Sequence, residues 1–222
     1  MVKYFWVINM NSPFDGITEL QKNKLFKLLA THIYTFNKNE EVLQTLKNDN
    51  IICILLEGYA HIININYNGE ENLVEELYEN SVFGTNISDI DYSEYQVRAI
   101  EDSKVLVIDY KKLVDYKNIN HNYYNVFIIN LFEIVNSKLK MNNDRIRILT
   151  KKSIRDKLLA FFENEYKKSR SKFIYLPNNF KDLADYLSIN RSAMFRELKY
   201  LKDEKFIKID GKKIILLYTP IV

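Results

Sequence analysis

The sequence predicts an α+β chain in three consecutive parts: a β-roll, a long helix, and a basic module of short helices and a hairpin. Three observations support this order. Short apolar runs separated by turn residues extend from Phe36 to about Tyr110, and a helical pattern without Gly or Pro runs from Ile119 to Leu149. Basic residues are concentrated after this helix. We therefore expect three domains, at residues 1–118, 119–149 and 150–222.

The region from Phe36 to about Tyr110 has the pattern of a β sandwich or roll. Its apolar runs are short, and the Asn68-Gly69 pair between two of them is a strong hairpin signal. The expected strands are Ile51–Leu56, Tyr59–Ile65, Leu73–Leu77, Gln96–Ile100 and Lys104–Asp109. A helical lead-in should precede them, from Ile17 to His32, with an apolar side made of Leu20, Leu25, Leu28 and Leu29.

The composition limits the classes of protein that this chain can belong to. Apolar residues make up 47% of the 222 residues, which indicates packed globular domains. The single cysteine, Cys53, excludes an internal disulfide, a multi-cysteine zinc site and a cysteine-ligated iron–sulfur cluster. We expect it to be a small core residue, with a redox sensor as the alternative. Residues 1–10 do not resemble a signal peptide and no stretch is apolar enough to span a membrane, so we expect a cytoplasmic protein without membrane contact.

The long helix carries two apolar stripes, and this pattern predicts a homodimer. One stripe should pack against the β-roll, and it comprises Tyr124, Phe127, Leu131, Ile134 and Met141. The other follows a heptad spacing, which is typical of a seam between two helices, with an Asn as the kind of polar insertion that fixes register. We predict that the dimer seam contains Ile128, Phe132, Val135, Leu139, Asn142, Ile146 and Leu149.

The net charge of +3 conceals a strong asymmetry along the chain. Residues 1–150 hold 15 Lys and Arg against 20 Asp and Glu, a balance of −5, whereas residues 151–222 hold 17 against 9, a balance of +8. A basic module joined to a mildly acidic one indicates that the second meets a polyanion. Charge alone leaves open a merely solvated basic surface.

The basic module has the element order of a winged helix-turn-helix. The expected elements are an amphipathic helix Ser153–Tyr166, a strand Lys172–Leu176, a helix Phe180–Leu187 capped by Asn179, a tight turn at 188–190, a helix from Arg191 to about Glu204 capped by Asn190, and a hairpin around Asp210-Gly211. Such a module reads duplex DNA with the exposed N-terminal side chains of its second helix. The alternative is a winged helix that contacts a protein.

Base-reading and phosphate-binding roles follow from side-chain chemistry. We predict that Arg191, Ser192, Phe195 and Arg196 face base edges, because Arg makes a two-pronged contact to guanine and an aromatic ring contacts a thymine methyl. Phe195 could equally be a core residue. The residues expected to bind phosphates are Lys199, Lys202, Lys205, Lys208, Lys212 and Lys213.

With these parts in this order, the chain resembles the Crp/Fnr superfamily of bacterial transcription regulators over nearly its whole length. The densest resemblance lies in Leu56–Ile62, Val97–Ala99 and Leu183–Arg191, continuing through Phe195–Lys199 to Gly211-Lys212. The resemblance implies a cyclic-nucleotide-binding-like β-roll, a homodimer, a near-palindromic DNA site and contact with RNA polymerase. Arg191 and Arg196 match the family's recognition-helix arginines, but Ser192 stands where the family often has Glu.

The sensor half departs from the family members that bind cyclic nucleotides. Those carry Gly-Glu at the start of a short helix, for the ribose, and Arg-Ser several residues later, for the phosphate. This chain has Gly84-Thr85-Asn86 at the first place and Ser93-Glu94-Tyr95 near the second. We therefore predict a degenerate effector pocket at Gly84, Thr85, Asn86, Glu94 and Tyr95, and no response to cyclic AMP. The alternatives are an uncharged or differently charged small ligand, or a regulator that needs no ligand and is controlled by its own abundance.

Other chemistries find little support in the sequence. A haem would need an axial ligand, and the candidates His61 and His121 are more ordinary as surface or partly buried residues, so we expect no cofactor. The β-roll enzymes that bind metal need clustered His and carboxylates, which this sequence lacks, so we expect no enzyme. The rival function is a signalling or adaptor protein whose β-roll binds a small ligand and whose winged helix binds a protein.

Overall fold

The computed structural model describes residues 12–46, 50–85, 95–176 and 180–220. The chain forms two compact units that divide between Ser137 and Lys138, within the long helix. We describe each unit by itself. Among the described residues, no helix has both the length and the apolar character that a membrane crossing requires.

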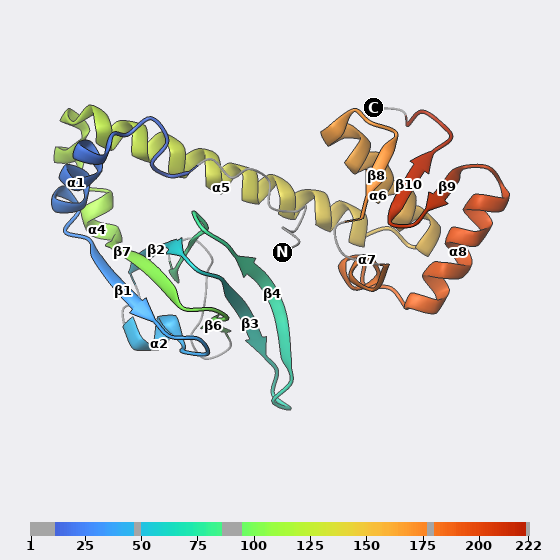
Figure 1. Ribbon diagram of the computed structural model, residues 1–222, viewed down its shortest axis with the longest axis horizontal. Helices are drawn as coiled ribbons and strands as arrows, with labels where there is room; N and C mark the ends of the chain where they lie inside the picture. The colour runs from blue at the N-terminus through green and yellow to red at the C-terminus, as the bar shows by residue number, and fades with distance from the viewer. Residues whose placement is uncertain (1–11, 47–49, 86–94, 177–179, 221–222) are drawn as a thin grey trace. The chain divides into compact units, whose positions relative to one another are not determined.

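Two antiparallel sheets form the β-roll (Figure 1). The four-stranded sheet has the order β1 (His32–Phe36), β7 (Ser103–Asp109), β2 (Ile51–Glu57) and β5 (Val82–Phe83). The three-stranded sheet has the order β4 (Glu71–Leu77), β3 (Ala60–Ile65) and β6 (Tyr95–Ala99). The expected hairpin joins β3 and β4, and Gly69 supplies its positive φ of 80°.

Strand β2 is buried on both faces, which explains its uninterrupted apolar run. Ile51, Cys53 and Leu55 point into the core between the two sheets, whereas Ile52 and Ile54 point into a second core. Because neighbouring side chains of a strand point to opposite faces, a strand with a core on each side needs apolar residues at every position. Cys53 is fully buried, and this burial raises the pKa of its thiol, as suits the structural role expected for it.

Helices of the first unit supply the second core. They are α1 (Glu19–Leu28), α4 (Tyr110–Leu113) and the start of α5 (Asn122–Leu149), which follows a 3-10 turn η1 (Tyr116–Asn120). Helix α2 (Val42–Leu46) instead packs into the core between the two sheets. Thr18 caps α1 through a capping box with Gln21. Leu25 and Leu29 of this region are fully buried, but Leu20 is 67% exposed, so its expected place on the apolar side is wrong.

The N-terminal half of α5 packs one of its two apolar stripes into this second core. Tyr124, Phe127, Leu131 and Ile134 are all buried there, as the spacing predicts. The Tyr124 hydroxyl donates a hydrogen bond of 2.6 Å to the carbonyl of Leu113, so the buried phenol has a partner. Apart from Ile128, the packing therefore leaves the other stripe of α5 outside the core of the unit.

The second unit has the elements of a winged helix. After the end of α5 come α6 (Ile154–Ser169), β8 (Phe173–Tyr175), α7 (Phe180–Tyr186), α8 (Arg191–Asp203), β9 (Ile207–Asp210) and β10 (Lys213–Leu216). The three strands form an antiparallel sheet in the order β8, β10, β9. Ser153, the expected first residue of the helix, is the N-cap of α6, whereas the expected cap Asn179 lies outside the described residues.

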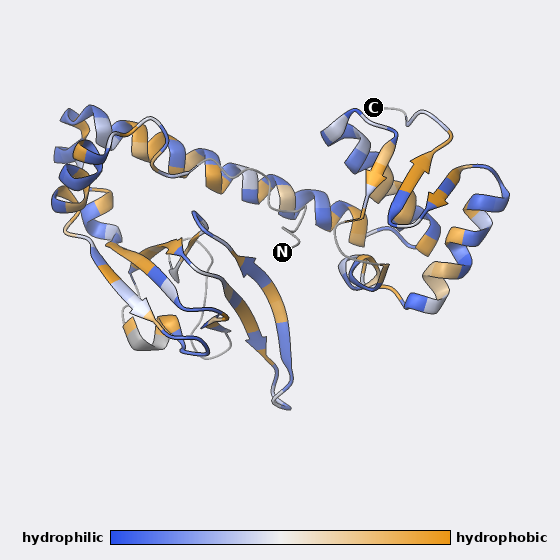
Figure 2. Ribbon diagram, viewed as in Figure 1, coloured by the Kyte–Doolittle hydropathy of each residue, from blue (hydrophilic) through white to orange (hydrophobic). Residues whose placement is uncertain are grey.

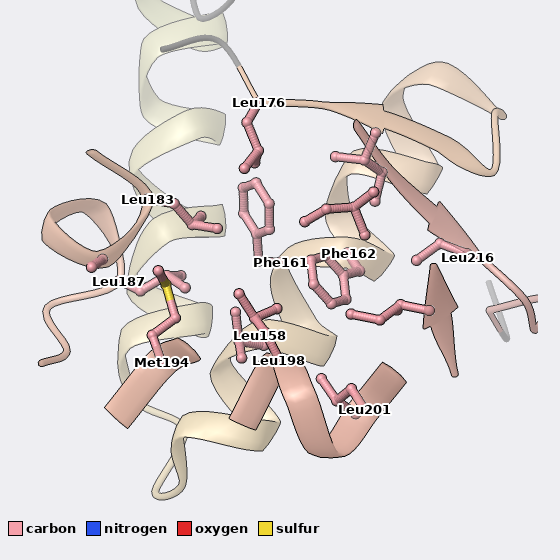
Figure 3. Close-up of a cluster of buried hydrophobic side chains, with 14 of the residues drawn as sticks. Leu158, Phe161, Phe162, Leu176, Leu183, Leu187, Met194, Leu198, Leu201 and Leu216 are labelled. Atoms are coloured by element: carbon pink, nitrogen blue, oxygen red, sulfur yellow. The ribbon is translucent and has the colours of Figure 1, made fainter. Parts of the chain in front are cut away.

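A single core holds this unit together (Figure 3). Phe161 and Phe162 of α6 lie at its centre, with ring centroids 5.8 Å apart, and are at most 1% exposed. Side chains of all the surrounding elements close over them: Leu158, Leu176, Leu183, Leu187, Met194, Leu198, Leu201 and Leu216. Helix α8 is thus fixed on its apolar side by α6 and α7, which leaves its other side to solvent.

Candidate nucleic-acid interface

Helix α8 begins at Arg191 because the preceding turn and cap enforce a start there. Ser188 adopts a positive φ of 49°, and the amide of Ile189 donates to the carbonyl of Ala184 at 3.0 Å, which closes the turn after α7. Asn190 has extended backbone angles, and its side chain accepts a hydrogen bond of 3.1 Å from the amide of Ala193. The sequence prediction of Asn190 as the cap is confirmed.

The four side chains expected to read bases gather on one exposed side of α8. Met194, Leu198 and Leu201 are at most 1% exposed and face the core. The exposed residues at the start of the helix are Arg191, Ser192, Phe195 and Arg196. They form what we call the reading face.

Phe195 is neither a core residue nor a free side chain. It is 41% exposed, its ring centroid lies 5.2 Å from that of Phe180, and the Arg191 guanidinium lies over it at 5.7 Å. A cation above an aromatic face is favourable and limits the rotamers of the longer side chain. Phe180, the first residue of α7, was not among the expected site residues. The only sequence feature that could have indicated it is its place at the start of the helix that precedes α8 in the helix-turn-helix.

Most of the lysines expected to bind phosphates are exposed around the reading face and the wing. These are Lys199, Lys202, Lys205, Lys208 and Lys212. The wing turns through Gly211, whose φ is 59°, and Lys212 lies beside it in the two-residue loop. Lys213 differs, since its ammonium lies 4.3 Å from the ring centroid of Phe173 and 5.6 Å from that of Tyr175.

In the region of the expected effector pocket, Gly84 and Thr85 both contact the backbone of β2 at Ile51. A Cβ at Gly84 would lie 2.5 Å from the carbonyl oxygen of Ile51, and φ there is +126°, so only glycine fits. The Thr85 hydroxyl accepts a hydrogen bond of 3.3 Å from the amide of Ile51. Tyr95 is half-buried at the start of β6, whereas Asn86 and Glu94 lie outside the described residues.

The only arginine near this region in the sequence, Arg98, is paired with a carboxylate. Its guanidinium donates two hydrogen bonds to Glu71, of 2.8 and 2.7 Å, and a third of 3.2 Å to Gln96. This pairing lowers the pKa of Glu71 and raises that of Arg98, so both groups stay charged at neutral pH. Arg98 is therefore already neutralised by a protein anion.

The two histidines considered as haem ligands lie in ordinary aromatic surroundings. The Nε2 atom of His61 is 2.7 Å from the hydroxyl of Tyr59, which itself donates to Glu76. Burial lowers the pKa of His61 although Glu76 acts in the opposite direction. His121 stacks on Tyr123 at 5.3 Å. Among the described residues, no three His, Cys, Asp or Glu side chains are grouped to hold a metal ion.

The expected dimer seam lies largely on exposed surface of α5 (Figure 2 shows its alternating apolar and polar bands). Phe132, Leu139 and Ile146 are 65%, 56% and 57% exposed, and Val135 is 37% exposed. Asn142 is exposed, while Ile128 and Leu149 are partly buried within their own units. Large apolar side chains spaced regularly along one helix are unusual on a free surface.

Comparisons with known proteins agree with this architecture. Residues 34–118 match the cyclic nucleotide-binding domain family. The putative HTH-type transcriptional regulator ycf28 of Porphyra purpurea is 24% identical, with 97% of this chain and 94% of the relative covered.

Solved structures show the same fold at low sequence identity. CprK complexed with OCPA superposes with a TM-score of 0.64 at 17% identity, covering 90% of this chain and 92% of the other. A CooA variant of Carboxydothermus hydrogenoformans gives 0.55 at 18% identity, covering 86% of each chain. A cyclic nucleotide-binding domain containing protein of Listeria monocytogenes gives 0.54 at 16% identity, covering 88% and 97%.

The described residues thus combine a roll matched by the cyclic nucleotide-binding domain family with a long helix and a winged helix. The chain shares the fold of CprK and CooA, in agreement with the fold expected from its resemblance to the Crp/Fnr regulators.

Proposed function

We propose that this chain is a homodimeric regulator that binds duplex DNA in a sequence-specific manner through α8. One observation carries the proposal: the reading face presents two arginines, a serine and an aromatic ring on the exposed side of a capped helix whose other side is fixed in the core. An α-helix of this kind fits the major groove, where each base pair displays a distinct pattern of donors and acceptors.

The roles on the reading face follow from chemistry and position. Arg191 and Arg196 read guanines through two-pronged hydrogen bonds, Ser192 tolerates several bases, and Phe195 touches a thymine methyl. The stacking of Arg191 on Phe195 supports a site in which guanine and thymine are neighbours. Lysines of α8 and of the wing bind phosphates, which position the protein without selecting a sequence.

The dimer would form through the seam on α5. Its exposed apolar residues belong to the helix that immediately precedes the winged helix, so pairing of two copies would present two reading faces. A two-fold dimer of this type binds a near-palindromic site with half-sites about one DNA turn, roughly 34 Å, apart. The family resemblance also suggests contact with RNA polymerase once the dimer is on DNA.

We further propose that cyclic AMP is not the effector. The ribose-binding Glu of the family is replaced by Thr85, whose hydroxyl is engaged with the β2 backbone. Arg98 is engaged by Glu71, so an anionic phosphate would have to displace a bonded carboxylate. Calorimetric titration with cyclic AMP should give no binding heat, and micromolar binding would overturn this part of the proposal.

The DNA-binding proposal is tested by selecting sequences from random duplexes with the purified protein. We expect a near-palindromic site whose affinity falls steeply as salt rises, because several lysines and arginines displace counterions from phosphates. Flat salt dependence, or selection without an enriched sequence, would instead favour the adaptor function, in which the winged helix binds a protein.

A further inference from the structure

Arg155 occupies a position where a cation is unfavourable unless it has partners. It is the second residue of α6, and the N-terminus of a helix carries partial positive charge. Its Nη1 atom donates to Glu197 at 3.3 Å and to Glu204 at 3.0 Å, and its Nη2 atom forms a further short contact with Glu204. The guanidinium also lies 5.4 Å from the ring centroid of Phe206. We call these four residues the Arg155 cluster.

The Arg155 cluster joins three elements of the winged helix. Arg155 belongs to α6, Glu197 to α8 and Glu204 is the C-cap of α8, while Phe206 leads into β9 of the wing. A guanidinium that is bonded to one carboxylate through both nitrogens, shared with a second and stacked on a ring has little freedom left. The cluster thus differs from an isolated surface ion pair, which typically contributes little.

The two carboxylates lie on the side of α8 that faces away from the expected DNA. Seven residues separate them, which is close to two helical turns, so they share one side of the helix. At about 100° per residue, this side lies roughly 160° around the axis from the centre of the reading face. DNA bound to the reading face would therefore leave the cluster intact.

A second basic residue of α6 fixes the turn between α7 and α8. Lys157, two residues after Arg155, donates a hydrogen bond of 3.1 Å from its ammonium to the carbonyl of Leu187. Helix α6 therefore contacts the start of the turn through Lys157 and the C-terminal half of α8 through Arg155. Hydrophobic packing of Met194, Leu198 and Leu201 holds α8 against the core, but it restricts rotation of the helix about its axis less than directed hydrogen bonds do.

The cluster stays charged at neutral pH. The hydrogen bonds that Arg155 donates to Glu204 lower the pKa of Glu204 and raise that of Arg155. Arg155 and Glu204 are therefore both ionised throughout the range in which DNA binding is measured.

We propose that Arg155 is a positioning residue for base recognition: by binding Glu197 and Glu204 it sets the rotation of α8 on the winged helix, and so the direction of the reading face. The inference rests on the proposed DNA-binding function. It concerns specificity, since a small rotation of α8 moves Arg191 and Arg196 off base edges while phosphate contacts, which are tolerant of geometry, persist.

The test compares Arg155→Gln with the matched control Arg170→Gln, which removes one exposed arginine from the other end of α6. Affinity is measured for a duplex selected by the wild-type protein and for a scrambled duplex. We expect Arg155→Gln to lower affinity for the selected duplex about ten-fold and to leave the scrambled duplex within about two-fold. The control should preserve the ratio of the two affinities. A second test exchanges the two charges. Arg155→Glu alone should lower the ratio of the two affinities, and the double variant Arg155→Glu with Glu204→Arg should restore it.

The affinity ratio separates positioning from mere stability. A variant that only unfolds part of the protein lowers both affinities by the same factor and so leaves their ratio unchanged. An unchanged ratio for Arg155→Gln would therefore overturn the proposal. So would a charge-exchanged double variant that does not restore the ratio. If the wild-type protein selects no sequence at all, the DNA-binding function itself is rejected. A wild-type protein that selects a site, with Arg155→Gln unchanged, rejects only the role of Arg155.

Discussion

The seam on α5 gives the sharpest quantitative prediction. Replacing Phe132 and Leu139 with Glu changes two side chains that are 65% and 56% exposed in the single chain. Burying a side chain of this size fully contributes about 1.5–3 kcal/mol, so covering the exposed half contributes about 1 kcal/mol. A dimer contains four such side chains, so the double variant loses about 4 kcal/mol of association, or about a thousand-fold in Kd.

Sedimentation velocity over a range of concentrations measures this change directly. The wild-type protein should be a dimer where the double variant is a monomer, and circular dichroism checks that the fold is kept. The matched control is Ile129→Glu, since Ile129 is 57% exposed on the same helix but lies outside the seam. A double variant that dimerises like wild type, or a control that dissociates equally, would refute the assigned seam.

Three further predictions concern the recognition helix and the roll. Arg196→Ala should cost about 1–3 kcal/mol and relax specificity at one base pair, whereas Lys212→Ala should weaken all duplexes alike; affinities for single-base variants of the site separate the two. Asn190→Ala should lower the free energy of unfolding by about 0.5–2 kcal/mol through loss of the cap of α8, as denaturant titration measures, and an unchanged midpoint would contradict the capping role. Gly84→Ala should fold poorly or not at all, because its Cβ meets a backbone carbonyl at 2.5 Å; normal stability of this variant would contradict the close approach.

The elements of the fold were predictable where local chemistry decides them. The run from Ile51 to Leu55, the Asn-Gly and Asp-Gly hairpins and the Asn190 cap each carry a signal within a few residues, and the structure has a strand, a turn or a helix start at each. The spacing of Phe127 and Leu131 likewise identified the stripe of α5 that packs inside its unit. Burial of Leu20 was wrong, because at about 100° per residue Leu20 lies roughly 140° and 180° around the axis from the buried Leu25 and Leu29, on the side away from the core.

Contacts between residues distant in sequence were not predictable. Arg155 is 42 residues from Glu197 and 49 from Glu204, and no periodicity links them. The only local signal was a cation in the first turn of a helix, where an acidic residue is favoured. The partnership of Arg98 with Glu71 depends similarly on two strands that pair with β3 from opposite sides. The exposure of Arg191, Ser192 and Arg196 was predictable because exposure on one helix follows from a short sequence pattern.

Because β2 is buried on both faces, few substitutions should be tolerated along it. In most strands of a roll, one side chain in two faces solvent, so a saturation mutagenesis library shows tolerance that alternates along the strand. Strand β2 should show no alternation, since each residue from Ile51 to Leu55 is at most 3% exposed. The same library should show a tolerant stretch in β4, whose first four residues, 71–74, are exposed. Sequences that drift far in the rest of this domain should therefore still carry a continuous apolar pentapeptide at β2.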